Sequence, residues 1–164
     1  MTENPLVANQ VLLGESAYAT AIDIVIAKAE SELMIFDDNL EKGDYQSLNR
    51  FHLMHNFLSK NPQSKLTIIL HRVDFFKKDC PRLLSLLKVY SHKMTVYTSN
   101  NEAKIAKDTL VIADKKHYVR RFHIDQARFK YHLDDVESSA SIVSRFNALL
   151  EHTQETITST NLGL

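Results

Sequence analysis

Apolar residues recur along the chain at two different spacings, and their succession predicts helices that alternate with short strands. Residues 17–30 place apolar side chains at helical spacing, so we expect an amphipathic helix that Ser16 can cap. Residues 33–36 form an apolar run that stops at Asp37 and Asp38, as a buried strand does where it enters a loop. This beginning is typical of a sheet covered by helices.

The same alternation continues through most of the chain. We expect further helices to begin at Asp44 and near Asp79, further strands at 66–70, 94–97, 109–113, 117–123 and 128–133, and a last helix at about 136–151. Strands that are apolar on both faces and separated by helices pair in parallel, because parallel pairing requires a crossover connection. The last two strands alternate apolar and polar residues with no helix between them, so they should pair antiparallel. The prediction is an α/β fold with a mixed, mainly parallel sheet flanked by helices.

Length and composition place these elements in one domain. A chain of 164 residues, 44% of them hydrophobic, is long enough to bury a substantial core. We assign residues 15–153 to the single domain, residues 1–14 to an N-terminal extension, and residues 154–164 to a loose C-terminal tail. The tail is expected because the end of the chain is rich in threonine and lacks an apolar face.

Charge and cysteine content argue against several classes of protein. Twenty basic and twenty acidic residues cancel, which disfavours a nucleic-acid binder that works through bulk charge, although a local basic patch can still form. The single cysteine, Cys80, cannot form an internal disulfide, and no apolar run approaches the roughly 20 residues that span a bilayer. The first residues lack the basic and then apolar pattern of a secretion signal. We therefore expect a cytoplasmic protein without a membrane segment.

The order of elements and three short segments resemble one half of a phospholipase D-like protein. The run Thr109–Asp114 is similar to that family's apolar strand, which ends in an aspartate and a turn. Val119–His123 follows near the place of the family's Gly-Ser-x-Asn segment, and Asp134 and Asp135 precede an amphipathic helix, like the family's last acidic turn. The resemblance covers about residues 15–153. It implies a half-domain of that fold, and it implies that two such halves face each other around a shared site.

The residues that perform the family's chemistry are replaced in this chain. The family motif is His-x-Lys-x-x-x-x-Asp, and counting back from Asp114 puts Lys107 at the histidine and Thr109 at the lysine. A protonated lysine has no lone pair with which to attack phosphorus, and threonine has no charge to hold a phosphate. Bulky Arg120 and Arg121 replace the small Gly-Ser step. The chain therefore resembles a degenerate phospholipase D-like half-domain of the kind found in uncharacterised bacterial proteins.

We interpret the chain as a non-catalytic binding, assembly or regulatory module of the bacterial cytoplasm, since a fold alone does not transmit an activity. The resemblance implies a homodimer in which the end of the sheet with Lys107, Thr109 and Arg121 faces the partner. It also implies a protein partner or an acetyltransferase-like domain, because similar domains occur joined to such domains. Two alternatives stay open: a phosphodiesterase or nuclease-type enzyme with altered residues, which would use His117 or His123, and a domain that binds phosphate or nucleic acid.

Alternating basic residues near the end of the chain suggest where an anion would bind. Arg128, Lys130 and His132 share one face of a predicted strand, while the residues between them pack inward. Arg121 and His123 can line up beside them on the preceding strand, which would give five cationic groups over two strands. The other interpretation, which we favour, is a solvated face or an edge strand protected by its charges.

No motif indicates a metal or a cofactor. His52 and His55 lie three residues apart on a predicted helix and could supply two zinc ligands. A zinc site needs three or four converging ligands, and the sequence spacing indicates no third ligand. Cys80 lacks an identifiable histidine partner, so a thiol nucleophile is not expected. Asp37 and Asp38 lie at the carboxyl end of a strand, where ligand sites form in open α/β sheets, and otherwise serve as turn and cap residues.

Overall fold

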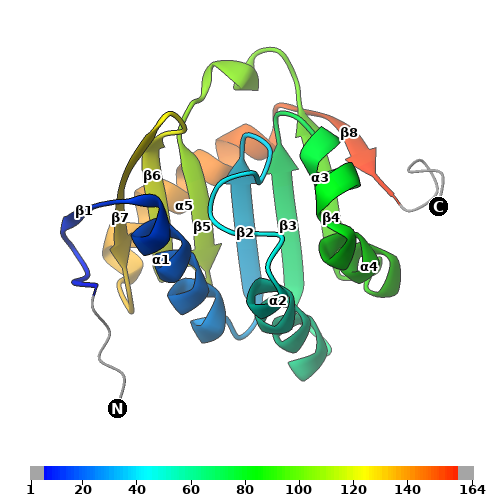
Figure 1. Cartoon of the computed structure of the whole chain (residues 1–164), viewed down its shortest axis with the longest axis horizontal. Helices are drawn as coiled ribbons and strands as arrows, with labels where there is room; N and C mark the ends of the chain where they lie inside the picture. The colour runs from blue at the N-terminus through cyan, green and yellow to red at the C-terminus, as the bar shows by residue number, and fades with distance from the viewer. Residues whose placement is uncertain (1–5, 159–164) are drawn as a thin grey trace.

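The structure is a computed structural model that describes residues 6–158 of the chain. Its elements, in chain order, are β1 (Val11–Leu13), α1 (Glu15–Lys28), β2 (Glu32–Asp37), α2 (Leu48–Lys60), β3 (Lys65–Leu70), α3 (Asp74–Asp79), α4 (Pro81–Val89), β4 (Met94–Ser99), the short 3-10 helix η1 (Ala103–Ile105), β5 (Thr109–Ala113), β6 (His117–His123), β7 (Gln126–His132), α5 (Val136–Leu150) and β8 (Thr153–Ile157). Figure 1 shows a single sheet with helices on both faces.

The strands form one mixed sheet in the order β1-β7-β6-β5-β2-β3-β4-β8. Two neighbouring pairs, β2 with β3 and β3 with β4, run parallel, and the other five described pairs are antiparallel. The expected mixed sheet is confirmed, but the expectation that it is mainly parallel is wrong. Parallel pairs occur only where helices connect the strands, α2 in the first case and α3 with α4 in the second. Short turns join β5, β6 and β7, and both edge strands also pair antiparallel.

Helices cover the two faces of the sheet unequally. α1, α2, α3 and α4 lie on one face, and α5 lies alone on the other (Figure 1). The residues of β2 alternate between the two sides: Leu33 and Ile35 join the core beneath α1, whereas Met34 and Phe36 join the smaller core beneath α5. Burial on both sides explains why this strand is apolar along nearly its whole length.

Both ends of the described chain pair with the sheet, which corrects two expectations from the sequence. β1 lies within the expected N-terminal extension and pairs with β7, and β8 pairs with β4 and lies within the expected loose tail except for its first residue, Thr153. Ile157 of β8 is buried and lies opposite Val96. The polar residues of β8 hide this strand in the sequence, because an edge strand can carry polar side chains on both faces. Residues 159–164 of the expected tail lie outside the described residues.

The helix ends agree in part with the expected caps. Of the two aspartates that precede the last helix, Asp135 caps α5, and its side chain accepts a backbone hydrogen bond from the first turn. Ser47 caps α2 in place of the expected Asp44. Two short helices, α3 and α4, replace the single helix expected near Asp79, and Pro81 begins the second because it has no N–H with which to continue the first. None of the helices within residues 6–158 is long and apolar enough to cross a membrane.

Candidate functional site

A cleft opens at one end of the sheet, beyond the last residue of β2 and before the first residue of β5. It comprises two adjoining pockets of about 190 Å³ and 250 Å³, which share Asp38, Arg72 and Ile124. The other residues that decide its chemistry are Tyr18, Asp37, Thr109 and Arg121 in the first pocket and His71, Lys104 and Lys107 in the second. Ligand sites form at the carboxyl ends of strands in open α/β sheets, so this cleft is the candidate functional site.

Three neighbouring strands place the floor of the cleft. Phe36 of β2 pairs with Leu110 of β5, and Thr109 pairs with Arg121 of β6. Residues that lie opposite each other in a sheet share a face. Asp37, Thr109 and Arg121 therefore follow one another across the sheet on the side that α1 covers.

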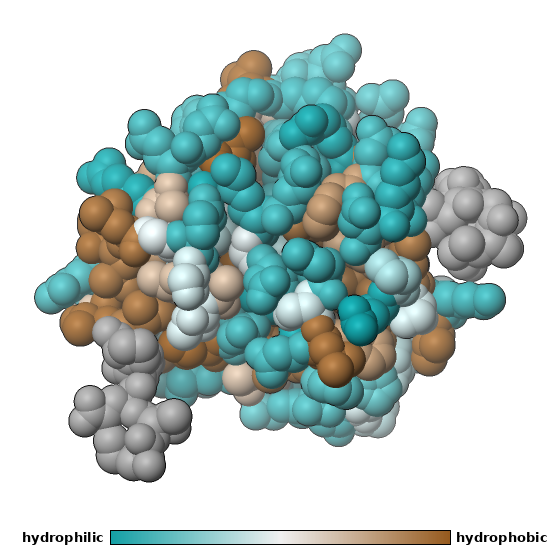
Figure 2. Space-filling model, viewed as in Figure 1, coloured by the Kyte–Doolittle hydropathy of each residue, from teal (hydrophilic) through white to brown (hydrophobic). Residues whose placement is uncertain are grey.

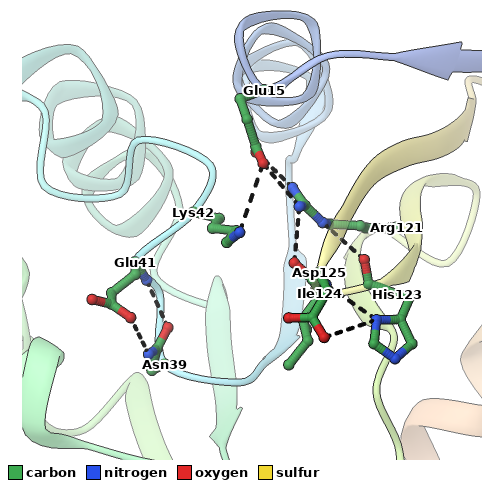
Figure 3. Close-up of polar contacts among 8 residues, drawn as sticks. All are labelled: Glu15, Asn39, Glu41, Lys42, Arg121, His123, Ile124 and Asp125. Atoms are coloured by element: carbon green, nitrogen blue, oxygen red, sulfur yellow. Dashed lines mark hydrogen bonds and ion pairs between the residues drawn. The ribbon is translucent and has the colours of Figure 1, made fainter.

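Arg121 is the centre of the hydrogen-bond network in the cleft, although its side chain is only 1% exposed. Its two terminal nitrogens donate to the carboxylate oxygens of Glu15 at 2.6 and 2.9 Å, as Figure 3 shows. Its guanidinium also donates to the backbone carbonyls of His123 and Ile124. It lies 4.9 Å from the centre of the Tyr18 ring. The hydrogen bond from Arg121 lowers the pKa of Glu15, so the pair stays ionised and internal partners occupy the arginine.

Tyr18 of α1 closes the floor of the cleft beside Thr109. Their two hydroxyl oxygens lie 2.5 Å apart, and both residues are buried. Burial, together with the nearby charge of Asp37, raises the pKa of Tyr18. The phenol therefore stays protonated near neutral pH, and the two hydroxyls bind each other.

Asp37 is a buried carboxyl at the end of β2, only 4% exposed. Burial raises its pKa to about 6, against the opposing effect of the backbone N–H groups of Leu40 and Asn39, which donate to Oδ1. A carboxyl with a perturbed pKa in a cleft is a candidate functional group. Asp37 can therefore exchange a proton close to the physiological range.

His71 lies at the rim of the cleft, but both of its ring nitrogens are occupied. Nε2 is 2.7 Å from the carbonyl oxygen of Ala106, and because a carbonyl only accepts, this nitrogen carries the proton. Nδ1 then accepts a hydrogen bond from the Ser99 hydroxyl at 2.6 Å. Burial lowers the pKa of His71, which keeps the ring neutral. The imidazole thus has no lone pair directed into the cleft.

Cations lie around the rim of the cleft. Arg72 donates to the carboxylate of Asp38 at 2.5 Å, and Lys104 donates to the backbone carbonyl of Ser99 at 2.9 Å. Lys107 is exposed and forms no ion pair within residues 6–158. The rim can attract an anion through Lys107, whereas the other two cations already bind the chain itself.

The structure places at the cleft two of the three residues that the sequence resemblance matched to the phospholipase D motif. Lys107 and Thr109 line it, whereas Asp114 follows the opposite end of β5. The Asp114 carboxylate accepts hydrogen bonds from three successive backbone N–H groups, residues 30–32, at 2.8 to 3.0 Å. Asp114 thus ties the turn after β5 to the start of β2, which is a structural role.

The residues predicted to form an anion site lie on different faces of the sheet. They are Arg121, His123, Arg128, Lys130 and His132. The members on β7 point to the α5 side, where Lys130 lies opposite Arg120, but Arg121 lies opposite Phe129 in the core on the α1 side. His123 ends β6, and its Nδ1 accepts a hydrogen bond from the backbone N–H two residues later. The alternation along β7 is confirmed, but the register places Arg120, not Arg121, beside Lys130.

His117 and His132 are buried away from the cleft. His117 pairs with Ala113 at the end of β5 that is far from the cleft, and it accepts a hydrogen bond from the backbone N–H of Asp134. His132 stacks on Tyr118 with the ring centroids 4.9 Å apart. The imidazoles that an altered phosphodiesterase would use, at positions 117 and 123, therefore do not meet in the cleft.

The described chain holds no group of three His, Cys, Asp or Glu side chains that could bind a metal ion. His55, one of the two histidines considered as ligands, lies 3.2 Å from the hydroxyl of Tyr90, and His52 is exposed. Cys80 is buried, and burial raises the pKa of its thiol to about 12. A thiolate therefore does not form near neutral pH.

The sequence did not identify Tyr18 and His71 as residues of the cleft, or Glu15 as the partner of Arg121. A signal was available for His71, because it follows an apolar strand at its carboxyl end, where ligand sites form. The pattern of the first helix indicates its buried face but not what that face meets. No local pattern predicts the pair Glu15 and Arg121, which are 106 residues apart in the sequence.

A known family accounts for nearly the whole chain. The family is described as Domain of unknown function (DUF7931), and it matches residues 14–161. The chain belongs to this family. The matched residues include every part of the cleft, so the cleft is a feature of this DUF7931 domain. A search of curated proteins gave no match.

Solved structures with low sequence identity share the fold. TrmBL2, an archaeal chromatin protein with a novel mode of DNA binding, has a TM-score of 0.66 and 13% identity, covering 93% of this chain and 55% of that one. Nuc, a phospholipase D family member from Salmonella typhimurium, has a TM-score of 0.59 and 10% identity, covering 92% and 99%. NucT from Helicobacter pylori has a TM-score of 0.61 and 15% identity, covering 88% and 96%. The chain thus spans about half of TrmBL2 and nearly all of Nuc and NucT, and this DUF7931 domain has a phospholipase D-like fold.

Proposed function

We propose that this DUF7931 domain is a non-catalytic assembly module that forms a homodimer through the end of the sheet beside the cleft. The observation that carries the proposal is the exposure of Ile105, whose side chain is 83% exposed on the connection between β4 and β5. This connection projects beyond the sheet, in light green at the top of Figure 1. An aliphatic side chain in such a position gains about 1.5–3 kcal/mol when a partner buries it.

A groove of about 900 Å³ lies beside Ile105, between η1 and α5. Ala103 lines it from η1, and Ser144, Ala148 and Leu149 line it from α5. These side chains are small or apolar, and Glu102, Arg145 and His152 add polar groups to the lining, so another protein surface can approach the backbone of α5 closely along part of the groove. The groove and the exposed isoleucine together form a surface suited to protein contact.

A second copy of the chain is the occupant that fits this surface. The groove and the projecting Ile105 belong to the same face, so a two-fold axis would put Ile105 of each copy into the groove of the other. Such an isologous contact closes on itself and limits the assembly to a dimer. The phospholipase D-like resemblance implies two facing halves, which agrees with this arrangement.

The bonding within the cleft supports a role without hydrolysis. Phosphoryl chemistry needs a nucleophile that can attack and a cation that holds the developing charge. The hydrogen bonds of His71, Thr109 and Arg121 are made to partners inside the chain. A phosphodiesterase or nuclease-type enzyme with altered residues would have to break these bonds first, and the zero net charge disfavours a general nucleic-acid binder.

Substituting Ile105 with lysine tests the proposed dimer. We expect the wild-type protein to show twice the chain mass of 18.8 kDa in light scattering, and Ile105→Lys to show the single mass, because the new charge would have to be buried. Val89→Lys is the matched control, since Val89 is 65% exposed on α4 and does not line the groove. A wild-type mass of 18.8 kDa at every concentration would contradict the dimer and favour a different protein, such as an acetyltransferase-like domain, as the partner.

A further inference from the structure

Strand β1 forms one edge of the sheet in residues 6–158. It is the first strand in the order of the sheet, and in the described chain it pairs only with β7. The N–H and C=O groups along an open edge are a template for another extended chain. Sheets commonly protect such an edge with charged side chains, but β1 consists of one valine and two leucines.

The register shows which backbone groups face the open edge. Gly14 donates its N–H to the carbonyl oxygen of Ala127 at 2.8 Å, and Leu12 lies two residues earlier in the same ladder. Bonded and non-bonded pairs alternate in an antiparallel ladder, so the N–H and C=O of Leu12 face β7. Those of Val11 and Leu13 consequently point away from β7, toward the edge.

The side chains along this edge are apolar and exposed. Two of the seven exposed large hydrophobic residues in the described chain lie on this strand, namely Val11 at 48% and Leu13 at 73%, and Val7, which is 53% exposed, precedes it in the chain. Figure 2 shows a brown patch at the left of the molecule, where Figure 1 places β1. Leu12, in contrast, packs against the main core. The edge therefore combines open backbone groups with side chains that gain from burial.

Two cations stand beside the apolar edge. Val11 lies opposite Lys130 and Leu13 lies opposite Arg128, on the α5 side of the sheet. Neither cation forms an ion pair with another residue of the range 6–158, although Arg128 lies 5.3 Å from the centre of the Phe122 ring. Long cationic side chains can reach across one strand. The charge of this edge is therefore complementary to carboxylates on a neighbouring strand.

We propose that β1 binds an extended segment of a partner protein as an added strand. This partner segment has an apolar residue, and an acidic residue lies two positions before it and another two positions after it. The backbone of Val11 and Leu13 would hydrogen-bond this segment, as in other cases of strand addition. The apolar residue covers the exposed side chains, and the acidic residues reach Arg128 and Lys130. A second copy of the chain fits this edge less well for two reasons. Pairing of two such short strands would bury little area, and the cations of both copies would lie beside the same pair of strands and repel each other. The proposal uses none of the residues of the dimer surface.

Fluorescence anisotropy with two labelled peptides tests the proposal. The first peptide is Thr-Glu-Thr-Val-Thr-Glu-Thr, and the control peptide has lysine in place of each glutamate. We expect the wild-type protein to bind the acidic peptide in preference to the basic one. Replacing Arg128 and Lys130 together with glutamate should reverse this preference, because the sign of the charge beside the edge is then inverted.

Substitutions at Leu13 test the role of the backbone. Leu13→Pro removes the N–H that points to the edge but leaves the ladder to β7 intact, so we expect binding about ten-fold weaker, as for the loss of one hydrogen bond. Leu13→Ala keeps this N–H and should weaken binding less than proline does. Circular dichroism checks that each variant is folded. If Leu13→Pro does not fold, the variant with glutamate at positions 128 and 130 still tests the proposal.

Three results would overturn the proposal. The first is equal binding, or no binding, of the acidic and basic peptides by the wild-type protein. The second is unchanged affinity in folded Leu13→Pro. The third is a wild-type dimer that dissociates in Leu13→Pro, because a second copy would then occupy the edge. A failure of the Ile105 dimer leaves these outcomes unaffected, so the two proposals are tested separately.

Discussion

Replacing Asp37 with asparagine separates the charge of this carboxyl from its shape. Asp37 is buried in the floor of the cleft, and burial raises its pKa from 3.8 to about 6. Asparagine has nearly the same shape and keeps an oxygen that can accept the backbone hydrogen bonds of Asn39 and Leu40. Because asparagine never becomes negative, the two proteins should differ most at neutral pH.

The shift in pKa sets the direction and the size of the effect. The folded protein keeps the proton of Asp37 up to about pH 6, whereas the unfolded chain loses it near pH 3.8. The native state therefore binds more protons between these values, and its stability falls as the pH rises through this window. A shift of about two units corresponds to about 3 kcal/mol in the free energy of unfolding. This destabilisation is complete above about pH 6 and absent below pH 3.8.

Urea denaturation over a range of pH measures this difference. The free energy of unfolding of Asp37→Asn, measured relative to wild type, should rise by about 3 kcal/mol from the acid to the neutral end of the range. Any effect of the amide that does not depend on pH adds equally at both ends. Asp79→Asn, at an exposed carboxyl without an ion pair in residues 6–158, is the control for the exchange of aspartate for asparagine. A difference between Asp37→Asn and wild type that is independent of pH would refute the reasoning that burial disfavours the charged carboxylate.

Three further substitutions test the structural roles of residues around the sheet. Arg121→Met should lower the free energy of unfolding by about 2–4 kcal/mol, because it removes four hydrogen bonds of a buried guanidinium. Glu15→Gln should lower the free energy of unfolding less, since the amide oxygen still accepts a hydrogen bond from Arg121. Urea denaturation compares the two variants. Asp114→Asn should lower it by about 1–3 kcal/mol, because the amide nitrogen cannot accept a backbone N–H. Burial opposes ionisation of Asp114, but its backbone hydrogen bonds together lower the pKa, so the stabilisation is complete above pH 3.8 and is lost on further acidification. Thermal unfolding measures this effect, and a loss of stability that is as large in strong acid as at neutral pH would contradict it.

Two residues of the cleft, Thr109 and Arg121, have structural partners in this chain. Thr109 binds Tyr18, and Arg121 binds Glu15. The phenol and the carboxylate both come from α1, so these contacts hold the first helix against β5 and β6. The cleft therefore contributes to the stability of the fold through the same residues that would otherwise face a ligand.

The sequence predicts the helices and the central strands because their patterns are local. Period-two alternation shows that Phe129 and Tyr131 pack inward, and both residues are buried. The same reasoning cannot supply the register between neighbouring strands, which depends on turns and bulges. Whether Arg120 or Arg121 lies beside Lys130 is a question of register alone, and the structure answers it in favour of Arg120.

The balance of parallel and antiparallel pairs also depends on non-local features. A helix between two strands indicates a parallel pair, and this rule holds for β2, β3 and β4. It does not show on which side of the sheet the next strand inserts. The connection 100–108 carries the chain to the far side of β2, where β5 pairs antiparallel.

Hydrolysis of a chromogenic phosphodiester, bis-para-nitrophenyl phosphate, tests most directly whether the cleft is catalytic. We expect no release of nitrophenolate above the rate in buffer at neutral pH, because His71 and Thr109 are held by partners inside the chain. Lys107→Ala and His71→Ala should give the same background rate. Turnover by the wild-type protein that falls in either variant would show that the cleft performs chemistry and would contradict the account.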